Sequence, residues 1–406
     1  MTKTILIVGT YDTKDAELRF LENVILEQGG RVKTMDVSVL KDPIAPTDIS
    51  KHQVASAGDS SITDAIKLDD ENGAMQIMAL GASRQTSQLH ADGKIDGVVI
   101  LGGSMGTDLA LDVCLALPLG VPKYIVSTIA FSPLLPADRI PADVQMILWA
   151  GGLYGLNSIC KASLSQAAGA VLGAAKATQK PDPNKPMVGM TSFGKTVLLY
   201  MVALKPALEE RGFEVAVFHP TGMGGRAFED LAAQGRFACV MDLATQEVGN
   251  HLFGSPVTAG ADRLTSAAKH GTPQIVAPGC HDLVDIPGWQ ELDARWANHD
   301  VHAHNRLLSS IVLTDDERRD VAKAHIDRLA LASGKSAFIM PLEGCHEWDR
   351  PGAPLHNPKG VQIFADTMKQ SMPSQTDYIP LDCHINDTAF STKVLEIFDG
   401  WFRSAK

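Results

Sequence analysis

The chain has 406 residues, of which 45% are apolar, and a formal net charge of −11. This length and apolar content predict two domains of ordinary size, each able to bury its own core. The negative charge argues against a nucleic-acid partner, whose phosphates require Lys and Arg. Six scattered cysteines without a C-x-x-C pair predict reduced thiols, and no apolar run approaches the roughly 18 residues of a membrane span. We therefore expect a soluble, cytoplasmic protein with no membrane partner.

The first half, residues 1–182, predicts an α/β domain. Apolar runs at 5–8, 32–39, 95–101 and 124–128 are typical of buried strands, and amphipathic segments at 13–28, 62–80 and 105–117 of helices. A polar, proline-rich stretch at 174–186 then favours an extended connector, with a domain boundary near residue 183.

The second half, residues 183–406, opens as the first does, with a short apolar run that ends in glycine and hydroxyl residues. Strands are predicted at 187–190, 214–218, 238–241, 274–277, 310–313 and 337–340. We expect two Rossmann-like domains, each with a mainly parallel sheet flanked by helices, that face each other across a cleft. Ligands of such sheets bind at the carboxyl ends of the strands.

Two loops of the first half have the composition of phosphate sites, because backbone N–H groups at a helix start can hold an anion. The first offers Gly9, Thr10, Asp12, Thr13 and Lys14. The second, the stronger candidate, offers Gly102, Gly103, Ser104, Gly106 and Thr107. For the first loop, a capped strand-to-helix turn explains the residues equally well.

Residues 189–196 match the P-loop pattern G-x-x-x-x-G-K-[ST], and Asp242 ends a predicted strand as a magnesium ligand would. Only residues 186–188 separate the linker lysine from the first glycine, and the apolar run continues through what should be loop. We therefore expect no true P-loop here.

Substrate-binding residues are predicted in the second half as well. A glycine-rich loop after a strand supplies Thr221, Gly222, Gly224 and Gly225, and later segments supply Glu247, Arg263 and Arg306. Arg263 or Arg306 would anchor an anionic substrate.

Eleven of the thirteen histidines lie at or beyond His219. Four stand beside Asp or Asn at predicted strand ends, where they predict a general base oriented by a carboxylate, or a metal site. These pairs are His281 with Asp282, His304 with Asn305, His346 with Asp349, and His384 with Asp387. No spacing such as H-E-x-x-H specifies a metal, so the identity of any divalent ion stays open.

Taken in order, these loops resemble the family of proteins related to the N-terminal, ATP-binding domain of the tomato mosaic virus resistance protein. The resemblance covers nearly the whole chain and rests on residues 9–14, 102–107, 219–229, 242–247, 259–263, 304–305 and 384–387. It implies two Rossmann-like domains and the binding of ATP with Mg²⁺, on residues 9–14 and 102–107. The chain departs from its relatives at 306–314, His281 and His346. Relatives also usually lack a lysine at the position of Lys195, which weakens the P-loop interpretation further.

Three functions follow as alternatives. The first is an ATP- and Mg²⁺-binding protein, an enzyme or a nucleotide-regulated protein, that acts on a small anionic metabolite in the interdomain cleft. The second is a hydrolase or lyase that uses a His/Asp site of the second domain without ATP. The third is a protein-interaction module without chemistry, against which the His/Asp pairs argue. A homo-oligomer is expected only because symmetric dimers are common.

Overall fold

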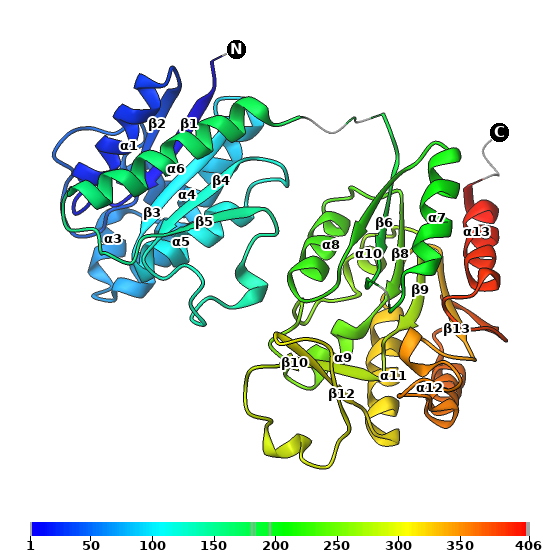
Figure 1. The fold of residues 1–406 in the computed structure, drawn as a ribbon. Helices are drawn as coiled ribbons and strands as arrows, with labels where there is room; N and C mark the ends of the chain where they lie inside the picture. Colours follow the sequence, from blue (N-terminus) through cyan, green and yellow to red (C-terminus); the bar gives the residue numbers. More distant parts are fainter. Residues whose placement is uncertain (1, 180–181, 183, 195, 403–406) are drawn as a thin grey trace. The chain divides into compact units, whose positions relative to one another are not determined.

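The structure is a computed structural model that describes residues 2–179, 182, 184–194 and 196–402. The chain forms two compact units, Met1–Pro181 and Asp182–Lys406. Each is an α/β unit with a parallel sheet between helices, as predicted (Figure 1). The cleft expected between them stays a prediction. Among the described residues, no helix is long and apolar enough to cross a membrane.

The first unit has a five-stranded parallel sheet in the order β2-β1-β3-β4-β5. Its strands are β1 (Thr4–Gly9), β2 (Arg31–Asp36), β3 (Gly97–Gly102), β4 (Lys123–Ser127) and β5 (Val144–Leu148). Its helices are α1 (Asp15–Glu27), α2 (Lys51–Ala57), α3 (Ile62–Lys67), α4 (Glu71–Ala91), α5 (Ser104–Leu115) and α6 (Ser158–Ala177).

Alternation along β1 explains why both faces of this sheet are covered. Ile5 and Ile7 pack with α1 and α6, whereas Leu6 and Val8 pack with α2 to α5 on the other side (Figure 1). A strand that is buried on both faces must be apolar throughout, as this one is.

The second unit has a six-stranded parallel sheet in the order β14-β13-β9-β8-β6-β7. Its strands are β6 (Met187–Thr191), β7 (Glu214–Phe218), β8 (Cys239–Ala244), β9 (Gln274–Gly279), β13 (Ser336–Pro341) and β14 (Asp377–Leu381). Its helices are α7 (Leu199–Glu210), α8 (Met223–Ala233), α9 (Gln246–Leu252), α10 (Ser266–Lys269), α11 (Asp315–Leu329), α12 (Pro358–Ser371) and α13 (Thr388–Phe402). Helices α7 and α13 pack on one face and α8 to α12 on the other (Figure 1).

The predicted strand at 310–313 exists but belongs to a different sheet. It is β12 (Leu308–Val312), which pairs antiparallel with β10 (Leu283–Pro287) and β11 (Val301–Ala303). A parallel neighbour would need a crossover helix, and the chain between β9 and β12 has only the short turn Ala294–Trp296. Strands β5, β10, β11 and β14 were not predicted.

Both parallel sheets are doubly wound. The chain passes from β1 to β2 on one side and then to β3 on the other, and it repeats this from β6 to β7 and β8. The reversal places a crevice at the carboxyl ends of β1 and β3, and of β6 and β8, where such sheets bind ligands.

Candidate functional site

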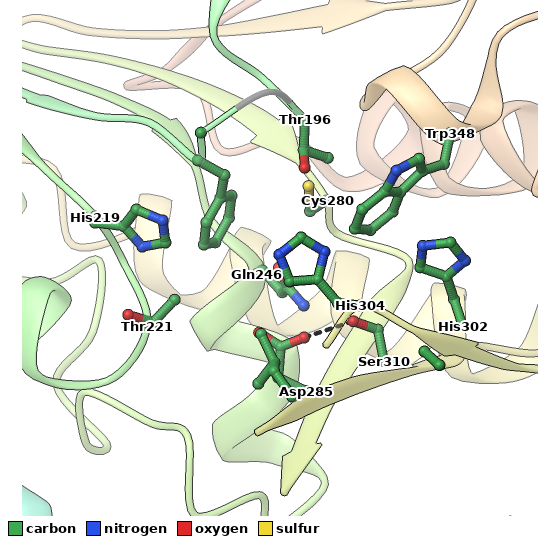
Figure 2. Close-up of a pocket in the computed structure, with 14 residues that line it drawn as sticks. Thr196, His219, Thr221, Gln246, Cys280, Asp285, His302, His304, Ser310 and Trp348 are labelled. Atoms are coloured by element: carbon green, nitrogen blue, oxygen red, sulfur yellow. Dashed lines mark hydrogen bonds between the residues drawn. The ribbon is translucent and has the colours of Figure 1, made fainter. Parts of the chain in front are cut away.

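A pocket of about 510 Å³ opens at the carboxyl ends of the second unit's strands. Its polar lining comprises Thr196, His219, Thr221, Gln246, Cys280, Asp285, His302, His304 and Ser310, and its aromatic lining Phe193 and Trp348. Figure 2 shows His219 and Thr221 on one side, Trp348 and His302 on the other, and Asp285 and Ser310 below.

The doubly wound topology brings these residues together. The loop after β6 supplies Phe193 and Thr196, and the start of α9, directly after β8, supplies Gln246. These are the two strands at which the strand order reverses. The antiparallel sheet β10-β12-β11 then closes the pocket with Asp285, Ser310 and the two histidines of the 302–304 segment.

Asp285 is the carboxyl group of this pocket. It is only 2% exposed, and its Oδ1 accepts a 2.7 Å hydrogen bond from the Ser310 hydroxyl, while its Oδ2 makes none within the described chain. Burial raises the pKa of Asp285, and the hydrogen bond from Ser310 offsets this only in part. A carboxyl group with a raised pKa in a pocket has the properties of a general acid or base.

Gln246 carries an unused donor into the same pocket. Its side chain is buried, and its Nε2 has no hydrogen-bond partner of regular geometry among the described residues. The Gln246 amide still lies near enough to Asp285 to lower the pKa of the Asp285 carboxyl group. Because buried polar atoms are nearly always hydrogen-bonded, this donor is available to a ligand.

The pocket histidines belong to aromatic clusters. The rings of His302 and Trp348 lie 4.1 Å apart, those of His304 and Trp348 5.6 Å, and those of His219 and Phe193 5.4 Å. Burial, with His304 as a smaller cause, lowers the pKa of His219 and of His302. Both imidazoles are therefore neutral near pH 7.

Of the histidine pairs predicted from the sequence, only His304 lines the pocket. Its neighbour Asn305 supports the turn between β11 and β12, since its Oδ1 accepts hydrogen bonds from the N–H groups of Leu307 and Leu308 at 2.8 and 3.0 Å. Arg306 is exposed on the same turn and is not part of the pocket lining.

The structure places His281, Asp282 and His346 inside the unit rather than in the pocket wall. His346 Nε2 lies 3.1 Å from Asp282 Oδ1, and Arg318 Nη1 lies 3.0 Å from Asp282 Oδ2. Burial would raise the pKa of Asp282, but His346 and Arg318 hold it well below its usual range. Conversely, burial would lower the pKa of His346, but Asp282 raises it. These contacts form a buried ion-pair cluster.

His384, Asp349 and Asp387 extend this buried cluster. His384 Nδ1 accepts a hydrogen bond from the Asn386 N–H at 3.1 Å, so the proton lies on Nε2, which is 3.0 Å from both His346 O and Asp349 Oδ1. Asp387 accepts from the His384 N–H at 2.9 Å. Asn386 Nδ2 also donates to Thr196 O at 2.9 Å, so the cluster positions a pocket loop. Within the described ranges, no group of His, Cys, Asp and Glu has metal-binding geometry.

Arg263 is buried with three carboxylates, contrary to the anion anchor expected from the sequence. Its Nε donates to Glu247 at 2.6 Å, its Nη1 to Glu229 at 3.2 Å and to Asp242, and its Nη2 to Asp242 at 2.8 Å. The last donor reaches Ala244 O at 3.2 Å. All five donors are used and the side chain has no exposed surface, so Arg263 has none for a ligand.

Glu247 occupies the N-terminus of α8, where a ligand anion would otherwise bind. Its Oε1 accepts the Gly222 N–H at 2.5 Å, and a methyl group on Gly225 would lie 1.8 Å from Oε2. Gly224 is equally constrained, since its methyl group would meet His219 O at 1.8 Å. These glycines therefore serve internal packing, and of this predicted binding loop only Thr221 lines the pocket.

In the first unit, the loop after β1 uses its own backbone donors. The N–H groups of Thr13 and Lys14 bond to Thr10 O, and that of Asp12 bonds to Ser38 Oγ. Asp12 Oδ2 accepts from two backbone N–H groups, at 3.2 and 3.1 Å, and Lys14 Nζ lies 5.1 Å from the Tyr154 ring. Gly9 packs against Leu18. This loop is a satisfied strand-to-helix turn, the alternative named above.

The loop after β3 keeps its donors free. Ser104 and Gly106 lie in the first turn of α5, and their N–H groups have no acceptor in the described chain, whereas the Thr107 N–H bonds to Gly103 O at 2.8 Å. A methyl group on Gly102 would lie 2.5 Å from Gly106 Cα, but one on Gly103 would meet only Thr128 Oγ1 at 3.8 Å. Gly103 therefore has open space beside it.

The P-loop-like segment does not form a P-loop. Gly189 lies within β6, and Asp242 accepts hydrogen bonds from Thr191 and Arg263. Lys195 is outside the described residues.

Several pocket residues were missed by sequence reasoning. Asp285 and Ser310 lie in short strands whose antiparallel pairing leaves no local signal, and Gln246 and Trp348 stand inside segments that were noted for other residues. His219 and His302 could have been found, because His219 directly follows the predicted strand at 214–218 and His302 stands two residues before the predicted His304.

Fold and site together define a two-domain Rossmann-like protein whose described pocket lies in the second unit. The chain belongs to the uncharacterised protein family UPF0261. The N-terminal domain of that family matches residues 3–180, and its C-terminal domain matches residues 185–402.

Relatives match along nearly the whole chain. A UPF0261 protein of Brucella suis biovar 1 (strain 1330) is 49% identical over 397 residues, 98% of this chain and 95% of its own. A UPF0261 protein of Clostridium tetani (strain Massachusetts / E88) is 33% identical over 96% of this chain and 97% of its own. The ToMV susceptible protein tm-1(GCR26) of Solanum lycopersicum is 26% identical over 97% of this chain but only 55% of its own. The resemblance to the family of the tomato protein is thereby confirmed, whereas the binding of ATP stays a prediction.

Solved structures show weaker likeness. UDP-GlcNAc 2-epimerase of Methanocaldococcus jannaschii, solved with UDP-GlcNAc and UDP, matches 68% of this chain and 83% of its own at 9% identity and a TM-score of 0.22. MurG of Acinetobacter baumannii matches 98% and 99% at 13% identity and a TM-score of 0.21. At these scores neither protein informs the function of this chain.

Proposed function

We propose that this protein is an enzyme, a hydrolase or lyase, that binds a small metabolite in the pocket of the second unit and uses Asp285 as general base. The observation that carries this is the position of Asp285, a carboxyl group that is 2% exposed, lines the pocket and is raised in pKa by burial. A base acts best when its pKa approaches the working pH, and burial moves a carboxyl group in that direction.

The neighbouring residues fit supporting roles. Ser310 donates to Oδ1 of Asp285 and so orients the carboxylate, which leaves Oδ2 to take a proton from the ligand. The free Nε2 donor of Gln246 can hold a ligand oxygen beside it. His304, a neighbour of Asp285, can return a proton to the product. The buried cluster around His346 holds the Thr196 loop in place.

Turnover of a metabolite mixture tests this proposal. The purified full chain is incubated with a neutral metabolite extract, and mass spectrometry follows which compounds disappear. We expect at least one compound to be consumed by the wild type and by Asp320→Asn, an exposed control on α11, but not by Asp285→Asn. Consumption by Asp285→Asn at the wild-type rate would refute the assignment.

A second candidate function is ATP binding with Mg²⁺ on the first unit. It is supported by the free N–H groups at the start of α5, next to the strand-order reversal at β1 and β3. The phosphates would lie against Ser104 and Gly106. Asp12 is a poorer magnesium ligand than expected, because Oδ2 already holds the 40–41 segment.

Isothermal titration with ATP, with and without Mg²⁺, tests this candidate. Gly103→Val fills space that is open in the fold, so it should abolish ATP binding while the unit still folds. Thr128→Ser, which alters only the neighbouring side chain, should bind as the wild type does. Undiminished ATP binding by Gly103→Val would exclude this loop.

A further inference from the structure

We propose that the ligand of the second-unit pocket is an uncharged, polyhydroxylated small molecule, of the sugar or polyol class, held against Trp348. This inference rests on the function proposed above and names its substrate class. It differs from the anionic metabolite expected from the sequence.

The charge of the residues that line the pocket argues against an anionic ligand. None of the described residues that line the pocket is Lys or Arg, and the buried carboxyl group of Asp285 would repel an anion. Arg263, one of the two anchors expected from the sequence, has all five donors engaged by Glu229, Asp242, Glu247 and Ala244 O. The other, Arg306, is not part of the pocket lining. An anionic ligand would therefore find no cationic side chain among these described residues, and an unpaired charge is costly in a buried site.

The N-terminus of α8 is closed to an anion as well. Glu247 already places its carboxylate there, 2.5 Å from the Gly222 N–H, and Gly225 leaves just enough room for it. The glycine-rich loop therefore stabilises a charge of the protein itself.

The hydrogen-bonding groups of the pocket favour a ligand with several hydroxyl groups. The hydroxyl groups of Thr196 and Thr221 each offer a donor and acceptor sites, and Gln246 offers a buried Nε2 without a partner. Ser310 offers acceptor sites alone, because its proton is donated to Asp285. A ligand with several hydroxyl groups matches this set, because each of its hydroxyls is also both donor and acceptor. A ligand with one polar group would leave most of these atoms unpaired.

Aromatic and imidazole rings give the pocket surfaces on which a polyol can pack. Trp348 and His302 face the cavity from one side and His219 from the other (Figure 2). Apolar C–H faces of a polyol pack on such rings while its hydroxyls reach the polar groups around them. A cation would also favour the rings, so a cationic probe belongs in the test.

The test is a matched ligand panel measured by thermal shift and isothermal titration on the full chain. It contains glucose and ribitol as neutral probes, gluconate and ribitol 5-phosphate as their anionic counterparts, and choline as a cation. We expect a neutral probe to bind at least tenfold tighter than its anionic counterpart. Trp348→Ala and Gln246→Leu should each weaken that binding at least tenfold, whereas Trp289→Ala, at a 69%-exposed tryptophan, should leave it unchanged.

Tighter binding of an anionic probe or of choline would overturn the proposal, and so would the absence of binding by both neutral probes. Failure of the enzyme assignment gives a different result. A neutral probe that binds through Trp348 but is never turned over, with no Asp285-dependent turnover of any compound, would refute the enzyme and retain the ligand class. Asp285-dependent turnover of an acidic compound would retain the enzyme and refute the uncharged ligand class.

Discussion

The hydroxyl of Ser310 donates a 2.7 Å hydrogen bond to Asp285, and the two residues are direct partners in the antiparallel pairing of β10 and β12. The sheet register therefore sets the geometry of the carboxyl group, because cross-strand partners lie side by side on one face. A shift of one residue would turn one of them away from the pocket.

This pairing predicts a pH effect. Replacing Ser310 with Ala removes a hydrogen bond that lowers the pKa of Asp285, so that pKa rises further. If the ionised carboxylate is the base, the acid limb of kcat/KM moves to higher pH in Ser310→Ala. The pH profile of the substrate identified by mass spectrometry checks this, with Ser309→Ala as the neighbouring control. An acid limb that does not move would show that Ser310 does not influence the pKa of the catalytic base.

Asp285→Asn should lower kcat by about 10²- to 10⁴-fold, the usual contribution of a positioned base. The amide keeps the shape of the side chain and the contact with Ser310, so ligand affinity should change little. Steady-state kinetics and calorimetry on the same variant separate the two effects. A loss confined to affinity would instead make Asp285 a binding residue.

Arg263→Leu should destabilise the second unit by about 3–5 kcal/mol, because it leaves the carboxylates of Glu229, Asp242 and Glu247 buried without their cation. The exposed variant Arg319→Leu should cost less than about 0.5 kcal/mol. Urea unfolding followed by tryptophan fluorescence measures both, since four of the five tryptophans lie in this unit. Unchanged stability of Arg263→Leu with loss of ligand binding would restore the anchor role.

Gly225→Ala should lower the stability of the second unit by about 2 kcal/mol or more, because its methyl group overlaps the Glu247 carboxylate. The matched control is Gly400→Ala in α13, where nothing lies within 4 Å and the change should add up to about 1 kcal/mol through helix propensity. The same urea experiment compares the two. Equal behaviour of the two variants would show that Glu247 can move aside.

His281 should make stability depend on pH. Burial lowers its pKa from 6.5 to about 4, so the unfolded chain binds a proton there that the folded chain does not. The shift contributes roughly 3 kcal/mol to the free energy of unfolding above pH 6.5, and this contribution is lost as the pH falls towards about 4. His281→Asn should lose less stability than the wild type across this window, whereas His52→Asn in the first unit should follow the wild type. Parallel curves for His281→Asn and the wild type would contradict the shift.

Local sequence determined which segments form the buried strands and which α/β class results, because a strand covered on both faces is a continuous apolar run wherever it lies in the chain. The runs at 5–8, 95–101 and 274–277 were therefore recognisable, while the more exposed strands β5 and β14 were not. Only the tertiary structure decided which polar residues meet. Asp285 joins Ser310 by an antiparallel register, His346 turns inward to a buried ion-pair cluster, and Arg263 is enclosed by three carboxylates. Each outcome depends on contacts between residues that are 16 to 64 positions apart in the sequence. It also depends on burial, which sets the protonation state of these side chains. No local sequence pattern encodes either the contacts or the burial.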